Sequence, residues 1–168
     1  IYNNFKDVQD IPYVVDLKKS HLGIVGRPDY CRARLRDIVI QMSFFQSYHD
    51  VCIVPIVGEA NKAEYDWMHW LPHTDIRSIN VSGVITGENQ RDQVLGHITR
   101  ELKARSMTRD ESRKETRFTP HYVFLIDESK LIINHSIMEH LKEEGSELGF
   151  SLIYITQTEK NLPENVKT

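Results

Sequence analysis

Short runs of apolar residues recur along the chain and predict a series of buried strands. Glycine, proline or charged residues bound these runs, as they commonly bound strands. The clearest run, 123–126, lies within the segment HYVFLIDESKL and is typical of a strand buried on both faces. Pro55 interrupts another run and predicts a weakened centre or a bulge there. The predicted strands lie at residues 12–17, 22–26, 51–57, 78–85, 121–126 and 150–155.

Helical spacing of apolar residues appears between these runs. Residues 30–47 form an amphipathic pattern, and further helices are predicted at 61–70, from about Asn89, and around Ile137. Residues 105–119 are almost free of apolar side chains and predict an exposed, mobile loop. The alternation of strands and helices predicts an α/β fold, with a mostly parallel sheet flanked by helices on both faces.

Glycine and polar residues follow several of the predicted strands, namely Gly26, Asp127, Glu128 and Gln157. In open α/β sheets, ligands bind at the carboxyl ends of the strands. In nucleotide hydrolases, an apolar strand that ends in Asp-Glu supplies one acid to hold Mg²⁺ and another to orient the attacking water. A simpler interpretation is that Asp127 or Ser129 caps the next helix.

The segment after Gly26 has the context of a phosphate loop but lacks its residues. A phosphate loop runs from a strand through GxxxxGK[ST] into a helix. Counted from Gly26, Cys31 replaces the second glycine, Arg32 the lysine and Ala33 the hydroxyl residue that binds Mg²⁺. We therefore predict a degenerate phosphate loop, with no ATP hydrolysis and no cofactor. Weak binding of a nucleotide or another anion stays open, because Arg27, Arg32 and helix N-terminal amides lie there.

The composition is that of an ordinary soluble domain, and we expect residues 1–168 to form one domain. Hydrophobic residues make up 40% and charged residues 27% of the chain, and the net charge of −3 favours no nucleic-acid partner. Cys31 and Cys52 form no CxxC pair and indicate no metal framework. Because the chain begins with Ile1 rather than Met, we expect it to be part of a longer protein, with any membrane segment outside this chain.

Three further groups of residues are candidates for binding. His69 and His73 have the spacing of zinc ligands on a helix, but Pro72 breaks that helix, so we predict no metal site. Trp67 and Trp70 either pack on the sheet or anchor a protein partner. The basic residues of 105–119 either face solvent or contact phosphates or an acidic surface; they are Arg105, Arg109, Arg113, Lys114 and Arg117.

The order of the motifs resembles that of the FtsK/SpoIIIE motor core. LGIVG precedes a helix, HYVFLIDESKL follows, and GFSLIYITQTEKNLPENV comes last. Asp127 and Glu128 match the acidic pair of that family, and Gln157 matches its TQ strand end. More specifically, WMHWLPH at 67–73 and the long insert before HYVFLIDE resemble the EssC/YukB-type coupling proteins of Gram-positive type VII secretion. The resemblance covers nearly the whole chain.

The resemblance implies the first cytoplasmic domain of a membrane-anchored secretion ATPase, with an ATPase-like fold and no working phosphate loop. Its expected location is the cytoplasmic face of the bacterial cell membrane. Its expected partners are the adjacent motor domains of the same polypeptide and other secretion components or substrates. Without a phosphate loop, the expected role of Asp127 and Glu128 is structural. Two alternatives are a divergent but active nucleotide hydrolase and a DNA-translocase segment, the latter disfavoured by the net charge.

Overall fold

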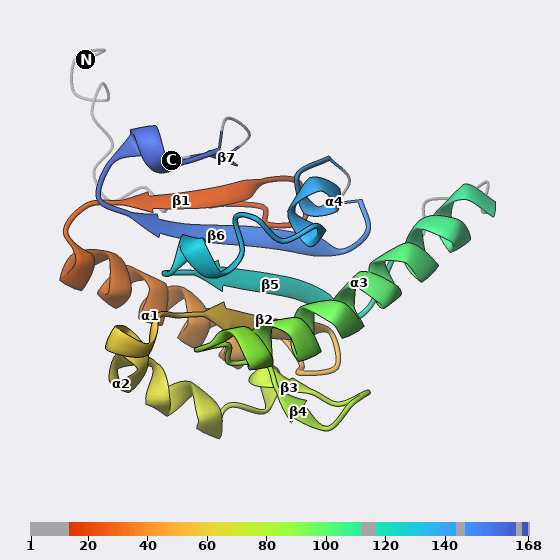
Figure 1. Ribbon diagram of the computed structural model, residues 1–168, viewed down its shortest axis with the longest axis horizontal. Helices are drawn as coiled ribbons and strands as arrows, with labels where there is room; N and C mark the ends of the chain where they lie inside the picture. Colours follow the sequence, from red (N-terminus) through yellow and green to blue (C-terminus); the bar gives the residue numbers. More distant parts are fainter. Residues whose placement is uncertain (1–13, 112–116, 144–146, 164–165, 168) are drawn as a thin grey trace, which may run out of the picture.

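A five-stranded parallel sheet forms the centre of the computed structural model, which describes residues 14–111, 117–143, 147–163 and 166–167. The strand order is β2-β5-β6-β1-β7 (Figure 1). These strands are β1 (His21–Val25), β2 (Val51–Ile56), β5 (His121–Ile126), β6 (Phe150–Thr156) and β7 (Val166–Lys167). A separate antiparallel pair consists of β3 (Asp75–Ile76) and β4 (Val81–Ser82). Because the sheet strands run parallel, their carboxyl ends share one edge.

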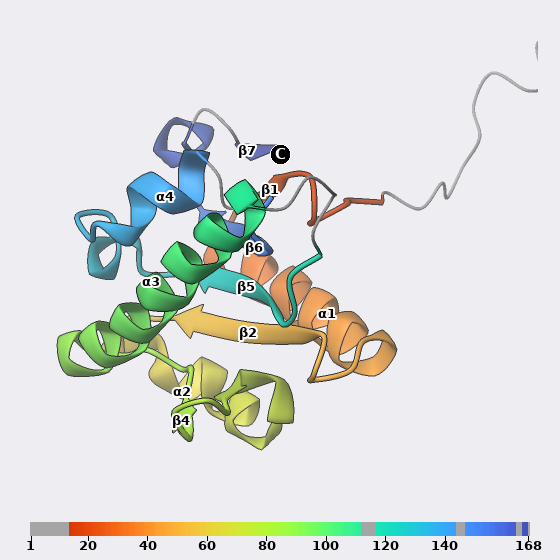
Figure 2. The same cartoon turned by 90° about the vertical axis from the view of Figure 1, so that its right-hand side faces the viewer.

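Helices cover both faces of this sheet (Figure 2). On one face lies α1 (Pro28–Phe45), beside α2 (Lys62–Tyr65) and the 3₁₀ turn Asp66–Trp70. On the other face lie α3 (Glu88–Glu111) and α4 (Ile137–Glu143). The predicted α/β class, with helices on both faces of a parallel sheet, is confirmed.

β5 is buried along its whole length, as its continuous apolar run predicts. Tyr122 and Phe124 contact the α3–α4 layer, whereas Val123 and Leu125 contact the α1 layer. This alternation follows from the two-residue period of a strand. β5 therefore joins two apolar cores, and the acids that follow it emerge at the carboxyl edge of the sheet.

Pro55 forms no bulge in β2, because the register between β2 and β5 runs without interruption from Val51 to Ile56. β2 is instead the edge strand of the five-stranded sheet, where a residue without an N–H is tolerated. The carbonyl oxygen of Pro55 accepts a hydrogen bond of 2.8 Å from the backbone N–H of Ile85.

Two of the predicted strands are wrong. Residues 14–17 form no strand, because Asp16 turns the chain there by accepting hydrogen bonds from the backbone N–H groups of Lys18 and Lys19; residues 12 and 13 lie outside the described part. Residues 78–85 do not form a strand of the main sheet either. Only Val81–Ser82 is extended, paired with β3, and Ile85 makes an isolated bridge to Ile56.

The predicted loop 105–119 is also wrong over its first part, because α3 continues to Glu111. Residues 112–116 lie outside the described part of the chain. The last residues form a short strand, β7, which pairs with β1. Within the described ranges, every helix is too short or too polar to span a membrane.

Candidate functional site at the carboxyl edge of the sheet

The connection between β1 and α1 is short. β1 ends at Val25 and α1 begins at Pro28, so only Gly26 and Arg27 lie between them. Cys31, Arg32 and Ala33, which correspond by count to phosphate-loop residues, therefore lie within the helix. The backbone N–H of Cys31 already donates to the carbonyl oxygen of Arg27 at 3.0 Å. The backbone at this edge is helical where a phosphate loop would wrap its ligand.

Cys31 fills the space beneath the start of α1. Its side chain is fully buried, and its Sγ lies 3.6 Å from the carbonyl oxygen of Ile24 in β1. Burial raises the pKa of this thiol, and the nearby Asp127 carboxylate raises it further. Cys31 is therefore a neutral packing residue between β1 and α1.

Asp127 accepts three hydrogen bonds at the carboxyl end of β5. Its Oδ2 lies 3.2 Å from Arg32 Nε, 3.0 Å from the Tyr65 hydroxyl and 3.3 Å from Asn61 Nδ2. The side chain of Asp127 is 8% exposed and that of Arg32 is 19% exposed. The three donors come from α1, from α2 and from the 3₁₀ turn before it. We call these four side chains the Asp127 cluster.

The electrostatics of the cluster keep its donors in their donating forms. Burial raises the pKa of Tyr65, and the Asp127 carboxylate raises it further, so the phenol stays protonated. Burial lowers the pKa of Arg32, but the charge and hydrogen bond of Asp127 outweigh this, and the net pKa is raised. A permanent cation within the protein thus neutralises the carboxylate.

Glu128 has a different role from Asp127. Its Oε1 accepts from the backbone N–H of Lys130 at 3.2 Å, which caps the 3₁₀ turn Ser129–Leu131. The simpler interpretation expected Asp127 or Ser129 to cap the next helix. A side chain of this segment does act as a cap, but it is that of Glu128. Gly58 lies beside this carboxylate, since a Cβ on Gly58 would be 3.3 Å from Glu128 Oε2. Gln157 follows β6 with an exposed side chain.

The two tryptophans have different environments. Trp67 is partly buried against the α1 core, and its Nε1 donates to the carbonyl oxygen of Glu64 at 3.1 Å. The guanidinium of Arg36 lies 5.8 Å from the centre of the Trp67 ring. Trp70 is 87% exposed. Trp67 therefore packs on the domain, whereas Trp70 presents its ring to solvent.

The two histidines of the same segment are held apart by their environments. His69 is exposed, whereas His73 is buried with its Nε2 2.9 Å from the carbonyl oxygen of Gln46. Across the described ranges, no three His, Cys, Asp or Glu side chains lie close enough together to hold a metal ion.

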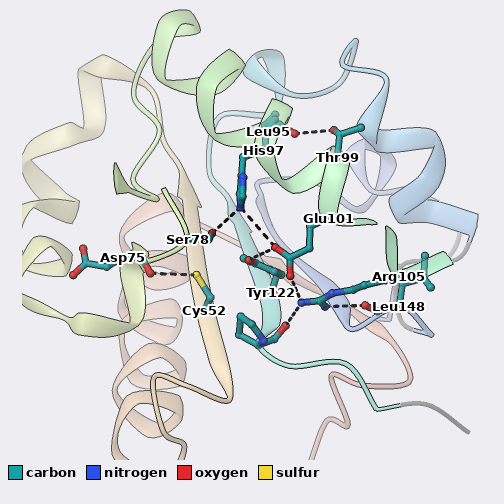
Figure 3. Close-up of polar contacts among 11 residues, drawn as sticks. Cys52, Asp75, Ser78, Leu95, His97, Thr99, Glu101, Arg105, Tyr122 and Leu148 are labelled. Carbon is teal, nitrogen blue, oxygen red and sulfur yellow. Dashed lines mark hydrogen bonds and ion pairs between the residues drawn. The ribbon is translucent and has the colours of Figure 1, made fainter. Parts of the chain in front are cut away.

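Arg105 is buried rather than displayed on a loop. It is 5% exposed, and its guanidinium donates to the carbonyl oxygens of Leu148 and Pro120 and to Glu101 (Figure 3). Tyr122 donates to the second oxygen of Glu101 at 2.7 Å. Arg105 thus joins α3 to the amino ends of β5 and β6. Sequence reasoning missed this role, although the four-residue spacing of Glu101 and Arg105 is a recognisable pairing signal.

The other basic residues of the 105–119 segment do not form one surface that the structure describes. Arg109 donates to Glu147 at 3.1 Å and also pairs with Asp110. Arg117 is exposed. Arg113 and Lys114 lie outside the described residues.

A parallel sheet between two helical layers, with an acid pair after the fully buried strand β5, gives the molecule an ATPase-like fold, with a helix where the phosphate loop would be. Two solved structures share this fold. The cytoplasmic domain of EssC aligns with a TM-score of 0.66 at 13% identity, over 89% of this chain and 31% of that one. EssC ATPases 2 and 3 from Geobacillus thermodenitrificans align with a TM-score of 0.61 at 13% identity, over 89% and 30%.

Sequence similarity identifies the relatives. The chain is 35% identical over 164 residues to the ESX secretion system protein EccC of Geobacillus thermodenitrificans. It is 34% identical over 164 residues to the ESX secretion system protein YukB of Bacillus subtilis. Each match covers 98% of this chain but only 11% of the relative. No family model matches the chain. The chain is therefore a homologue of one segment of the EssC/YukB/EccC proteins of type VII secretion.

Proposed function

We propose that this chain is one ATPase-like domain of a type VII secretion protein, and that it works through protein contacts without hydrolysing ATP. Its relatives are secretion proteins, of which it spans about a ninth. In this proposal, a parent ATPase is anchored in the bacterial membrane and carries the domain at its cytoplasmic face. The contacts are with adjacent motor domains and with other secretion components or substrates.

The observation that carries the proposal is that side chains of the same chain already donate hydrogen bonds to the Asp127 carboxylate. A nucleotide hydrolase needs a free carboxylate at this strand end to hold Mg²⁺. Here Arg32 neutralises that carboxylate, and Tyr65 and Asn61 donate to the same oxygen. Binding Mg²⁺ would require the protein to break an ion pair whose members are 19% and 8% exposed.

The phosphate side of the site supports the same proposal. The residue at the lysine position, Arg32, already has a carboxylate partner, and Ala33 offers no hydroxyl. Asp29 lies in the first turn of α1, where its negative charge opposes an incoming anion. We therefore also propose that the domain holds no nucleotide.

Calorimetric titration of the 168-residue chain with Mg²⁺-ATP and with Mg²⁺-ADP tests this, together with a phosphate-release assay. We expect no binding at about 1 mM nucleotide, which corresponds to a free energy weaker than roughly −4 kcal/mol. We also expect no release of phosphate. Arg32→Ala is the informative variant. Arg34→Ala is its matched control, because Arg34 lies on the same helix and its contacts, an ion pair with Asp37 and a guanidinium 5.4 Å from the Tyr30 ring centre, are with exposed residues.

Three outcomes would overturn the proposal. Mg²⁺-dependent binding that is lost in Arg32→Ala but kept in Arg34→Ala would make the edge a working phosphate site. Turnover that is lost in Glu128→Gln would make the chain a divergent hydrolase. Salt-sensitive binding to duplex DNA would favour a translocase segment.

A further inference from the structure

The outer side of α1 is apolar near its C-terminal end. Ile40 and Phe44 are one turn apart and are 53% and 80% exposed. Phe45 is 75% exposed, and its ring centre lies 5.0 Å from that of Phe44 in an edge-to-face contact. The inner side of the same helix is already buried through Cys31, Leu35 and Val39. Burial against the sheet therefore does not explain the apolar residues on the outer side.

The segment that carries Trp70 packs in the same apolar core as α1, through Tyr65 and Met68. Two contacts hold its segment along the helix: the Arg36 guanidinium near the Trp67 ring, and His73 Nε2 on the carbonyl oxygen of Gln46. Trp70 lies between these two contacts in the sequence. Figures 1 and 2 both show this segment beyond the edge strand β2, next to α1. We call Ile40, Phe44, Phe45 and Trp70 the α1 patch.

The area of the α1 patch indicates what kind of partner covers it. Aromatic side chains have about 150–250 Å² each, so the exposed fractions correspond to roughly 500 Å² of apolar surface. This is at the upper end of what monomers expose. A stable complex between free proteins needs about 800 Å² from each partner. Contacts between domains of one chain bury a total of about 600–1,500 Å², and roughly 500 Å² from each side fits that range.

A surface of this size suits a partner that is tethered, because a covalent link raises the effective concentration of that partner to about the millimolar range. The relatives supply such a geometry, since this chain spans 11% of EccC and 30% of a solved fragment that contains EssC ATPases 2 and 3. We propose that the α1 patch docks an apolar surface of another ATPase-like domain of the same polypeptide. This inference rests on the proposed function and names its partner.

Site-specific photo-crosslinking in the full-length gene product tests the docking. The photoreactive residue p-benzoylphenylalanine replaces Phe44 in one variant and Trp70 in another. Met107 is the matched control position, because it is 68% exposed but lies on α3, on the opposite face of the sheet. We expect mass spectrometry to map crosslinks from positions 44 and 70 to another ATPase-like domain of the same chain, at a yield several-fold above that from position 107. Equal yields at all three positions, or crosslinks to a different protein or to lipid, would overturn the inference.

Sedimentation of the isolated 168-residue chain distinguishes the tethered partner from a second copy. We expect a monomer at micromolar concentration, because the α1 patch is too small to hold a free partner. A dimer that Phe44→Ser converts to monomer would identify a second copy as the occupant and overturn the inference. Phe44 is exposed, so this substitution leaves the core intact. Nucleotide binding in the calorimetric titration would contradict the proposed function alone, because the crosslinks report docking independently.

Discussion

The ion pair of Arg32 and Asp127 at the carboxyl edge can be tested by substituting each of its members. Arg32→Ala removes the cation while Asp127 keeps two neutral donors, Tyr65 and Asn61. Asp127→Asn removes the charge while keeping an oxygen that can accept from Tyr65. The two substitutions and their combination form a double-mutant cycle that isolates the interaction between the charges.

The magnitude follows from the geometry. At 3.2 Å, two unit charges attract by roughly 5 kcal/mol in an effective dielectric constant of about 20. Desolvation of both groups offsets a large part of this attraction. Hydrogen bonds to charged groups contribute about 1.5–3 kcal/mol net. We therefore expect Arg32→Ala to lower the free energy of unfolding by about 2 kcal/mol, Asp127→Asn by about 1 kcal/mol, and the coupling to exceed about 1 kcal/mol.

Urea unfolding followed by circular dichroism measures these values. In a thermal scan, a loss of about 2 kcal/mol corresponds to a decrease in Tm of roughly 4–8 °C for a chain of this length. Arg34→Ala is again the control, because its pair with Asp37 is more than half exposed and should contribute less than about 0.5 kcal/mol. A coupling energy below about 0.5 kcal/mol, or an Arg32→Ala variant as stable as the control, would refute the view that Arg32 is the built-in counter-charge of Asp127.

Three further predictions concern stability. Burial first, and then nearby cations, lower the pKa of His121 to about 4, whereas an unfolded histidine titrates near 6.5. As the pH falls, this histidine therefore takes up a proton in the unfolded state before it does so in the folded state. The contribution of His121 to stability is complete above about pH 6.5 and decreases by about 3 kcal/mol towards pH 4. His121→Gln should flatten a pH series of urea unfolding curves by that amount; parallel curves would contradict this. Arg105→Met should lower the free energy of unfolding by about 3 kcal/mol, because it leaves buried acceptors unpaired, while Arg100→Met on the exposed side of α3 should change it by less than about 0.5 kcal/mol; similar losses would exclude the buried role. Gly83→Ala should destabilise by about 1–3 kcal/mol, because its Cβ would lie 2.9 Å from a backbone carbonyl oxygen, whereas Gly96→Ala in α3 meets open space and should stabilise by up to about 1 kcal/mol; the same sign for both in urea unfolding would refute this.

The strands with long apolar runs could be predicted from the sequence because their burial is almost complete. β5 occupies residues 121–126 as predicted, and β6 extends the predicted 150–155 by one residue. Both strands have apolar cores on their two faces, so most of their positions are apolar whichever face they point to. The strand predicted at 78–85 failed because its apolar residues serve a hairpin and a single bridge rather than a ladder.

The end of α3 could not be predicted from hydrophobicity. Residues 105–111 have few apolar side chains, yet Arg105 is buried. Its guanidinium lies close to the rings of Tyr122 and Phe150 and is held by hydrogen bonds. A long charged side chain can cover apolar surface in this way while counting as polar in any pattern. Tertiary contacts with Leu148 and Pro120 therefore determine where this helix runs.

The carboxyl edge was predicted in its location but not in its contacts. The acid pair follows β5 as expected, whereas the partners of Asp127 are 62 to 95 residues away in the sequence. One local signal was available, because proline is favoured at the first position of a helix and Pro28 marks the start of α1. Since β1 ends at Val25, a helix that begins at Pro28 leaves a connection of two residues, which is too short to wrap phosphates.

Polar side chains at both ends of the parallel sheet bond to other groups of the same chain. At the carboxyl edge, Arg32 occupies the Asp127 carboxylate. At the amino edge, His121 bonds to Ser151, whose hydroxyl donates to the carbonyl oxygen of Leu17. The amino edge nevertheless has a cavity of about 940 Å³, whose lining includes Asp50, His121 and Gly149. Ligand binding at the carboxyl edge would require the pair of Arg32 and Asp127 to break, whereas the exposed apolar side chains of the α1 patch can be covered without breaking an interaction of that kind.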